Sequence, residues 1–423
     1  MRVLKLGSRG SDVMEIQALL KKIGYNPGPI DSIFGKLTKR ALINFQRDNL
    51  LIPDGIIGPK TYEKLEPLLL GYDTYILKPG DTLYNLANKY YTTVKKILIA
   101  NPNLNPINLQ VGEKIIIPYG IDIVDTNIGY TYDILERDIL GLSKRYPFLE
   151  VGIPGKSVLG KNLYYIKFGN GPNKVFYNGA HHALEWITSP LLMKFLENIS
   201  KAYVNNDTIR GYNINEIYNN SSIYIMPMVN PDGVDLVING LQRNNPYYYE
   251  LLRLNDTNRP FSKVWEANIR GVDLNHNYDA LWQTYKNLAD SLGYNKPGPT
   301  RYPGSFPESE PESRTVADFT RDNNFRLVIA YHSQGEVIYW DFQDLASEEA
   351  KEIGEKFSLV SGYTLAETYG AASYSGYKDW FIQDFKKPGY TIEVGKGTNP
   401  LPITQFDTIY KDNEEVLLLG SII

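Results

Sequence analysis

Two side chains of the kinds that bind metal ions, those of His182 and Glu185, stand three positions apart just after the apolar residues 175–177. The pair falls where a strand is expected to end and a helix to begin. An imidazole nitrogen and a carboxylate can both bind one tetrahedral zinc ion and leave a position open for water. The chain has four histidines and no cysteine, so few positions remain for a third ligand. Thiolate metal sites, disulfides and cysteine nucleophiles are excluded.

The third ligand is expected at His332. It directly follows residues 326–331, a mostly apolar run and a predicted strand, and precedes Ser-Gln-Gly. A histidine at such a strand end lies at the carboxyl edge of the sheet, where ligands bind in open α/β sheets. Taken alone, His332 also fits a hydrogen-bonded buried histidine, but the half-site favours a ligand. His181 is expected to be a bystander, because its spacing to Glu185 is one residue too long.

Two histidines and a glutamate with an open fourth position are typical of catalytic rather than structural zinc. At such a site the pKa of a bound water molecule falls to about 7 and the scissile carbonyl is polarised. The reaction then needs a general base, and Glu393 offers one within the apolar residues 390–394. Burying an unpaired carboxylate is costly, so we expect Glu393 to face the metal or another cation. A solvated glutamate on an edge strand is the alternative interpretation.

The region that carries these residues alternates strand-like apolar runs with helix-like segments. The runs lack clean alternation, as expected for strands covered on both faces. Candidate strands are residues 162–168, 174–177, 222–228, 326–331 and 390–394. Candidate helices are residues 132–144, 185–203, 312–322 and 347–360. The pattern predicts one large α/β domain over residues 128–423, with a mixed central sheet.

The composition is that of a globular protein with several domains. The chain has 423 residues, 43% of them hydrophobic, and a net charge of −4 with both signs interspersed. Its apolar runs are much shorter than the roughly 18 residues that span a membrane. The lack of a basic stripe argues against nucleic-acid binding. The first residues show no signal-peptide core, so we expect cytoplasmic synthesis and release by another route if the protein acts outside the cell.

Residues 1–68 contain an internal repeat. An Asp/Gly turn followed by a threonine occurs at residues 31–38 and again at 54–61. Apolar residues recur at helical spacing between these turns, which predicts a compact three-helix domain. The pattern resembles the peptidoglycan-binding domain (type 1) family, and a generic helical bundle is the alternative. The residues that carry the resemblance are Leu6-Gly7, Gly10, Val13, Gln17, Gly24-Tyr25, Phe45-Gln46 and Asp54-Gly55.

Residues 74–118 predict a strand, two helices and a closing strand, with Asp81 or Thr82 as the cap of the first helix. This order resembles a LysM module over nearly its full length. The resemblance implies binding of glycans that contain N-acetylglucosamine, in a groove between the two strand–helix loops. By this resemblance Gly80, Asp81, Thr82 and Asn103 are glycan-binding candidates, although each can equally be a plain turn or cap residue.

Residues 130–415 resemble the M14 zinc carboxypeptidases, because they carry a series of motifs in the order found there. The motifs are Gly-Ala-His-His-Ala-Leu-Glu-Trp-Ile-Thr at 179–188, Asn-Pro-Asp-Gly at 230–233, Gly-Val-Asp-Leu-Asn at 271–275, His-Ser at 332–333 and Thr-Ile-Glu at 391–393. The resemblance implies one zinc ion per chain. Its ligands would be His182, Glu185 and His332, with Glu393 as general base and acid.

The resemblance also assigns residues around the metal. Asp273 matches the carboxylate that orients the first ligand histidine, as zinc-bound imidazoles usually require. Asn275 matches a residue that contacts the carboxylate of the substrate. Oxyanion stabilisation needs a fixed cation near the metal. Arg270 is our candidate for this cation, Arg243 competes with it, and an ordinary surface arginine is the alternative interpretation of Arg270.

Departures from the digestive carboxypeptidases bear on the substrate. After the position of Asn275 those enzymes usually have an arginine that grips the terminal carboxylate, whereas this chain has His276. An imidazole does not replace the bidentate fork of arginine, which argues against simple activity on protein C-termini. Ile382 replaces a tyrosine of the digestive members, so the pocket differs from theirs. Asp379 would suit an amine on the substrate and would equally suit a buried structural role.

Two wall-binding modules followed by an M14-like hydrolase resemble the bacterial γ-D-glutamyl-(L)-meso-diaminopimelate peptidases. The resemblance implies zinc-dependent hydrolysis of the γ-D-Glu–diaminopimelate bond in peptidoglycan stem peptides, at the bacterial cell wall or on the spore. Glycan strands and stem peptides would be the partners, with no nucleic acid and no membrane. The modules would raise the effective concentration of the hydrolase at an insoluble polymer. The alternatives are a wall-tethered metallocarboxypeptidase acting on protein C-termini and a non-catalytic wall-binding protein.

Overall fold

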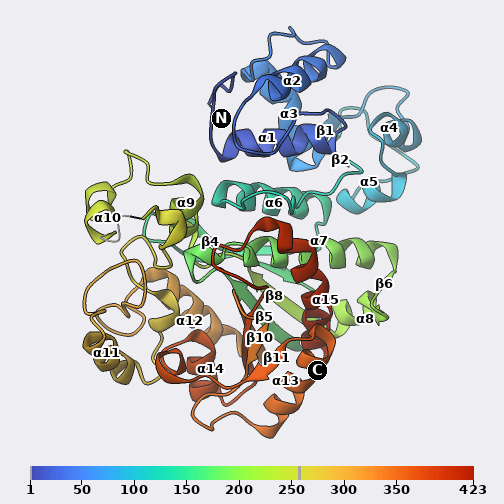
Figure 1. Ribbon diagram of the computed structural model, residues 1–423. Coiled ribbons are helices and arrows are strands. Elements are labelled where there is room, and N and C mark those ends of the chain that lie inside the picture. Colours follow the sequence, from blue (N-terminus) through green and yellow to red (C-terminus); the bar gives the residue numbers. More distant parts are fainter. Residues whose placement is uncertain (1, 256–258) are drawn as a thin grey trace. The chain divides into compact units, whose positions relative to one another are not determined.

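The structure, a computed structural model, describes residues 2–255 and 259–423 (Figure 1). The chain divides into two compact units. Met1–Ile128 and Asp133–Leu149 form the first, and Gly129–Tyr132 and Glu150–Ile423 form the second. Among the described residues, no helix is both long and apolar enough to cross a membrane.

The first part of the N-terminal unit is the predicted three-helix domain, with α1 (Ser11–Lys22), α2 (Lys36–Asp48) and α3 (Pro59–Leu70). The internal repeat of the sequence recurs in the hydrogen bonds. In each copy one buried glutamine amide donates to an aspartate side chain, a backbone carbonyl and a threonine hydroxyl. These sets are Gln17 with Asp31, Ile33 and Thr38, and Gln46 with Asp54, Ile56 and Thr61.

The second part is the predicted strand–helix–helix–strand module. Its elements are β1 (Tyr72–Ile76), α4 (Leu83–Lys89), α5 (Val94–Ala100) and β2 (Lys114–Pro118), and the two strands pair antiparallel. Thr82 caps α4, because its hydroxyl oxygen accepts the backbone N–H of Asn85 at 3.1 Å.

Helix α6 (Tyr132–Arg145) packs with these modules over most of its length. The guanidinium of Arg145 donates to the backbone carbonyls of Gly71 at 2.7 Å and Ile121 at 2.9 Å. Arg137 forms an ion pair with Glu15 of α1. The two modules and α6 therefore form one body rather than domains on long tethers.

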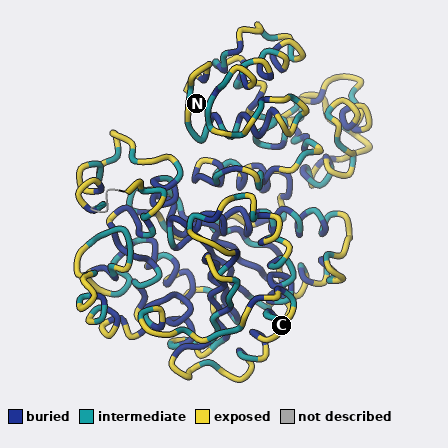
Figure 2. Tube along the Cα trace, in the orientation of Figure 1, coloured by how far each residue is buried: buried dark blue, intermediate teal, exposed yellow. Residues whose placement is uncertain are grey.

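The second unit is built around an eight-stranded mixed sheet in the order β11-β10-β12-β9-β5-β8-β4-β3, which confirms the predicted α/β domain. Strands β12, β9, β5 and β8 run parallel to one another. Every residue of β8 and β9 is buried, as expected for strands covered on both faces (Figure 2). The strands are β3 (Glu150–Lys156), β4 (Asn162–Phe168), β5 (Asn173–Gly179), β8 (Ser221–Met226), β9 (Leu327–His332), β10 (Val337–Tyr339), β11 (Thr364–Ala366) and β12 (Gly389–Glu393).

Helices cover both faces of this sheet (Figure 1). Successive side chains of β5 point to opposite faces. The hydroxyl of Tyr177 donates to the carbonyl of Leu417 in α15, whereas the ring of Phe176 packs against rings of α12 and α14. The helices of the two faces are α7 (Thr188–Asn205), α13 (Glu348–Ser361) and α15 (Phe406–Ile422), opposite α12 (Pro311–Asn323) and α14 (Tyr377–Phe385).

One predicted boundary is corrected near the metal half-site. The helix expected from Glu185 begins at Thr188, and Glu185 instead ends a 3₁₀ turn, Ala183–Glu185. The remaining helices are α8 (Ile214–Asn220), α9 (Pro231–Asn239), α10 (Tyr248–Leu254) and α11 (Trp282–Ser291). The remaining short elements are β6 (Thr208–Ile209) and β7 (Tyr212–Asn213), and 3₁₀ turns at Phe261–Lys263, Leu274–His276, Gly370–Ser373 and Ile403–Gln405.

Candidate metal centre

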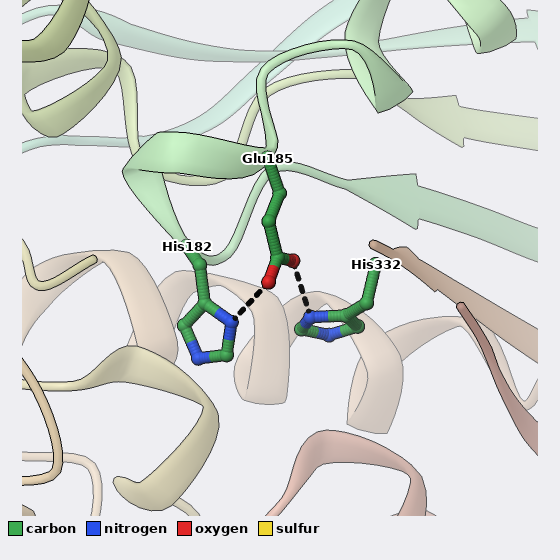
Figure 3. Close-up of side chains that lie close together, drawn as sticks. All are labelled: His182, Glu185 and His332. Carbon is green, nitrogen blue, oxygen red and sulfur yellow. Dashed lines mark hydrogen bonds and ion pairs between the residues drawn. The ribbon is translucent and has the colours of Figure 1, made fainter. Parts of the chain in front are cut away.

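Three side chains from two distant parts of the sequence converge at the carboxyl edge of the sheet: His182, Glu185 and His332 (Figure 3). Each offers one ligand atom, and these atoms lie within 4.8 Å of one another. The carboxylate of Glu185 lies between the two rings. Its Oε1 is 3.0 Å from Nδ1 of His182, and its Oε2 is 2.8 Å from Nδ1 of His332.

The fold explains why these residues meet. Strands β5 and β9 are parallel neighbours, so the turn after β5 and the last residue of β9 reach the same edge. His332 is that last residue. The turn that carries His182 and Glu185 is held by Thr188, whose hydroxyl donates to the carbonyl of Glu185 at 2.9 Å and accepts the N–H of Ala180 at 2.8 Å.

The hydrogen bonds show that this group suits a cation. Nε2 of His182 lies 3.0 Å from Oδ1 of Asp273, and a carboxylate only accepts, so Nε2 carries the proton. Nδ1 of the neutral ring then carries a lone pair, and it lies 3.0 Å from Oε1 of Glu185. Two acceptors at this distance need a cation or a proton between them. Two imidazole nitrogens and a carboxylate are a donor set that fits zinc.

The charges around the group favour bound cations. Burial opposes ionisation of Glu185, but His182 and His332 outweigh it and lower the pKa of this carboxyl. Burial likewise opposes ionisation of Asp273, and the interaction with His182 holds its pKa well below the usual value. Both carboxyl groups therefore stay ionised beside the rings.

The expected general base lies next to the group. Glu393 is the last residue of β12 and stands directly opposite His332 in the parallel pair β12–β9. Its side chain is half-buried. Burial raises the pKa of Glu393 well above its usual value, and the charge of Glu185 raises it further. A carboxyl group of high proton affinity thus stands beside the ligand group.

The side-chain contacts of Arg270 are with residues outside this group. Its guanidinium is 3.4 Å from the hydroxyl of Tyr247 and 3.6 Å from the carboxylate of Glu310, and 45% of its side chain is exposed. The glycine that follows it, Gly271, has a φ of +75°, a left-handed conformation that favours glycine. The competing residue, Arg243, is exposed in the segment between α9 and α10.

Asn275 and His276 lie on the 3₁₀ turn that follows Asp273. The side-chain oxygen of Asn275 accepts the N–H of Tyr377 at 3.1 Å. Nδ1 of His276 is 3.0 Å from the carbonyl oxygen of Tyr374, and its ring stacks on Tyr285 with centroids 4.0 Å apart. A carbonyl only accepts, so Nδ1 carries the proton and Nε2 of the neutral ring is an acceptor.

Asp379 is buried, and its contacts belong to the fold. One carboxylate oxygen accepts the N–H of Gly376 at 3.1 Å, which closes the first turn of α14, and the other lies 2.6 Å from the ammonium of Lys378. These contacts agree with the structural reading of Asp379, the alternative to an amine-binding role.

Two residues near the metal group were missed by the sequence analysis. The side-chain amide of Asn399 lies 3.4 Å from Oε1 of Glu185. The carbonyl of Glu266 accepts the N–H of Ala183 at 2.9 Å, and its carboxylate interacts electrostatically with Glu185 and Glu393. Both residues lie in loops, without periodicity or ligand spacing that would have marked them.

The glycan-binding candidates occupy the turn before α4 and the segment after α5. Gly80 has a φ of +84°, and the carboxylate of Asp81 accepts the N–H of Lys78 at 2.7 Å. Thr82 is the cap of α4, and Asn103 is exposed. Gly80, Asp81 and Thr82 thus shape the turn itself, whereas Asn103 presents its side chain to solvent.

Comparison with known proteins identifies the domains. Residues 135–416 match the zinc carboxypeptidase family, peptidase M14. The chain belongs to the M14 zinc carboxypeptidase family. Residues 9–65 match a peptidoglycan-binding domain, and residues 75–118 match the LysM domain. Both resemblances inferred for the N-terminal part are therefore confirmed.

Two relatives align with most of this chain. It is 42% identical to gamma-D-glutamyl-L-diamino acid endopeptidase 1 of Lysinibacillus sphaericus, over 82% of this chain and 98% of the relative. It is 37% identical to the uncharacterized protein YqgT of Bacillus subtilis, over 68% of this chain and 76% of that protein.

Solved structures share the carboxypeptidase fold. Bovine thrombin-activatable fibrinolysis inhibitor in complex with tick carboxypeptidase inhibitor matches with a TM-score of 0.52 at 20% identity, over 70% of this chain and 97% of that chain. Carboxypeptidase A of Helicoverpa armigera matches with a TM-score of 0.52 at 18% identity, over 91% of this chain and 86% of that chain.

The family and the arrangement of the site residues indicate the same metal chemistry. The M14 family uses zinc, and the group His182, Glu185 and His332 offers this chain a site for it. The chain is a zinc metallopeptidase with two peptidoglycan-binding modules.

Proposed function

We propose that this wall-anchored zinc peptidase hydrolyses the amide bond between γ-D-glutamate and a diamino acid, diaminopimelate above all, in peptidoglycan stem peptides. The observation that carries the proposal is the 42% identity to a gamma-D-glutamyl-L-diamino acid endopeptidase over 98% of that relative. The modules that precede the catalytic unit support the same polymer as substrate.

Each residue of the site has a separate role in this reaction. His182, Glu185 and His332 would hold the zinc ion, and Asp273 fixes the proton of His182 on Nε2. Bound zinc supplies a Lewis acid that polarises the scissile carbonyl and lowers the pKa of water. Glu393 takes the proton of the attacking water on its carboxylate and gives it to the leaving amine. Arg270 has no part in this proposal, because its guanidinium is held by Tyr247 and Glu310.

The hydrogen bonding of His276 supports the proposal that the substrate is not a protein C-terminus. In its neutral form the ring donates Nδ1–H to the carbonyl of Tyr374 and leaves only an acceptor, Nε2, for the substrate. A lone acceptor repels a terminal carboxylate, which an arginine at this position would grip with two N–H groups. Asn275 remains a proposed contact to the substrate.

The N-terminal modules hold the enzyme on the wall. We assign Gly80, Asp81, Thr82 and Asn103 of the LysM module to glycan binding. While a module is bound to a glycan strand, the catalytic unit meets the neighbouring stem peptides at a high effective concentration. We place the enzyme at the bacterial cell wall or on the spore. With a net charge of −4, we expect no nucleic-acid partner.

Defined soluble muropeptides test the proposal. The tetrapeptide L-Ala-γ-D-Glu-meso-diaminopimelate-D-Ala, incubated with zinc-loaded protein and followed by mass spectrometry, should yield L-Ala-D-Glu and the dipeptide meso-diaminopimelate-D-Ala. A panel of ordinary peptides with free C-termini should stay intact. Trimming of that panel with no cleavage of the muropeptide would support a metallocarboxypeptidase instead. Bound zinc without turnover of either substrate would support a non-catalytic wall-binding protein.

A further inference from the structure

One side-chain amide joins three segments that carry the chemistry of the site. Asn399 lies in the loop that follows β12, six residues after Glu393. Its Nδ2 is 3.4 Å from Oε1 of the proposed ligand Glu185 and 2.5 Å from the backbone carbonyl of Ser333. Its Oδ1 accepts the hydroxyl of Ser333 at 2.8 Å. Ser333 directly follows the proposed ligand His332.

These contacts fix the orientation of the amide. An amide nitrogen only donates and an amide oxygen only accepts. The opposite orientation would place Oδ1 against the carbonyl of Ser333 and the carboxylate of Glu185, both of which are acceptors. The hydroxyl of Ser333 would then lose its acceptor. One N–H of Asn399 is thus committed to Ser333, and the other is directed at Glu185.

The contact selects one oxygen of the ligand carboxylate. Oε1 of Glu185 faces both the amide of Asn399 and Nδ1 of His182, whereas Oε2 faces His332. A buried carboxylate with only the two rings as neighbours could rotate about its last bond. The amide adds a third, uncharged contact on the Oε1 side. Such partners of metal ligands restrict the ligand to the orientation that the metal requires.

We propose that Asn399 is a positioning residue that holds the carboxylate of Glu185 ready for zinc. The inference rests on the ligand set His182, Glu185 and His332 given under the proposed function. The role is independent of the substrate, because it concerns only the metal and its ligand.

The test compares zinc binding in full-length variants. Asn399→Ala removes the amide, and Gln405→Ala serves as the matched control. Gln405 braces the same loop through Lys396, with bonds of 3.1 Å and 2.8 Å to its backbone, and has no hydrogen bond to Glu185. Zinc affinity is measured by competition with a chromophoric chelator, and zinc release by stopped-flow after addition of excess chelator. Thermal unfolding of the zinc-free proteins reports on folding.

Asn399→Ala should bind zinc about tenfold more weakly and release it faster, because partners of metal ligands typically contribute 10- to 100-fold to affinity. Gln405→Ala should bind zinc like the wild type. Equal zinc binding by folded Asn399→Ala and wild type would overturn the inference, as would an equal loss in Gln405→Ala, which would point to general loosening of the loop.

Ser333→Ala decides the question if Asn399→Ala does not fold. This change removes the hydroxyl that holds Oδ1, so zinc should be released faster than from the wild type, and an unchanged release rate would overturn the inference. A wild-type protein that binds no zinc would refute the ligand set and with it this role of Asn399. Muropeptide cleavage is not part of the readout, so an error in the proposed substrate leaves the result intact.

Discussion

Nε2 of His182 lies 3.0 Å from Oδ1 of Asp273, on the opposite side of the ring from Glu185. The carboxylate of Asp273 fixes which nitrogen carries the proton and so presents the other nitrogen to the metal. Its second oxygen accepts the backbone N–H of Arg301 at 2.9 Å, which holds the carboxylate in place.

Replacing Asp273 with asparagine should weaken zinc binding by about 10- to 100-fold. An amide has one acceptor oxygen, so it satisfies either His182 or Arg301 but not both, and it lacks the charge that raises the basicity of the ring toward a metal. Competition with a chelator measures the change. Asp279→Asn, at an exposed position nearby in sequence, is the matched control and should leave zinc affinity unchanged. Unaltered affinity in Asp273→Asn would contradict the orienting role.

Glu393→Gln should retain zinc and lose activity. A glutamine cannot take a proton from water, and proton transfer by a positioned side chain typically contributes about 10²- to 10⁴-fold to the rate. The measurement is kcat on the soluble muropeptide, together with zinc content by elemental analysis. Glu336→Gln is the control, because that carboxylate pairs with Lys396 on the surface side of the same edge. Activity within a few-fold of the wild type would exclude Glu393 as the base.

The sequence was sufficient to locate the strands that bear the site, because buried apolar runs mark them directly. The predicted strands overlap β4, β5, β8, β9 and β12. Strands β10 and β11 were missed because each has three residues, too few for a pattern. Strand β3 was missed because most of its residues are exposed and it contains glycine and proline.

Side chains that depend on backbone direction could not be placed from sequence. Arg270 stands next to a motif of the site, but its guanidinium contacts Tyr247 and Glu310. Asn399 reaches Glu185 only because a loop folds back over the end of β12. The ligand group itself was predictable, because two parallel neighbouring strands bring its members to one edge.

Asn103→Ala should weaken binding to insoluble peptidoglycan without changing catalysis. The side chain is exposed in the LysM module, and the loss of one hydrogen bond to a glycan corresponds to roughly a 2- to 10-fold loss of affinity. Sedimentation with purified walls measures binding, and kcat/KM on a soluble muropeptide measures catalysis. Asn88→Ala, on the exposed side of α4, is the matched control. An equal effect of both substitutions would remove Asn103 from the proposed glycan site.

A buried carboxyl group away from the metal should make stability depend on pH. Glu312 is fully buried; its carboxylate accepts the N–H of Val158 at 3.0 Å and the side-chain amide of Asn268 at 3.2 Å. Burial raises the pKa of Glu312 from 4.5 to about 7. The folded protein therefore keeps this proton where the unfolded chain releases it, so the contribution is fully present below about pH 4.5 and is lost as pH rises through 7.

Glu312→Gln should remove this loss. One pKa unit corresponds to about 1.4 kcal/mol, so the free energy of unfolding of the wild type should fall by up to about 3 kcal/mol more than that of the variant between pH 5 and pH 8. All five tryptophans lie in the second unit, so their fluorescence during urea unfolding reports on that unit alone. Glu355→Gln, exposed on α13, should follow the wild type. Parallel pH profiles for Glu312→Gln and wild type would show that Glu312 is ionised in the folded protein at neutral pH.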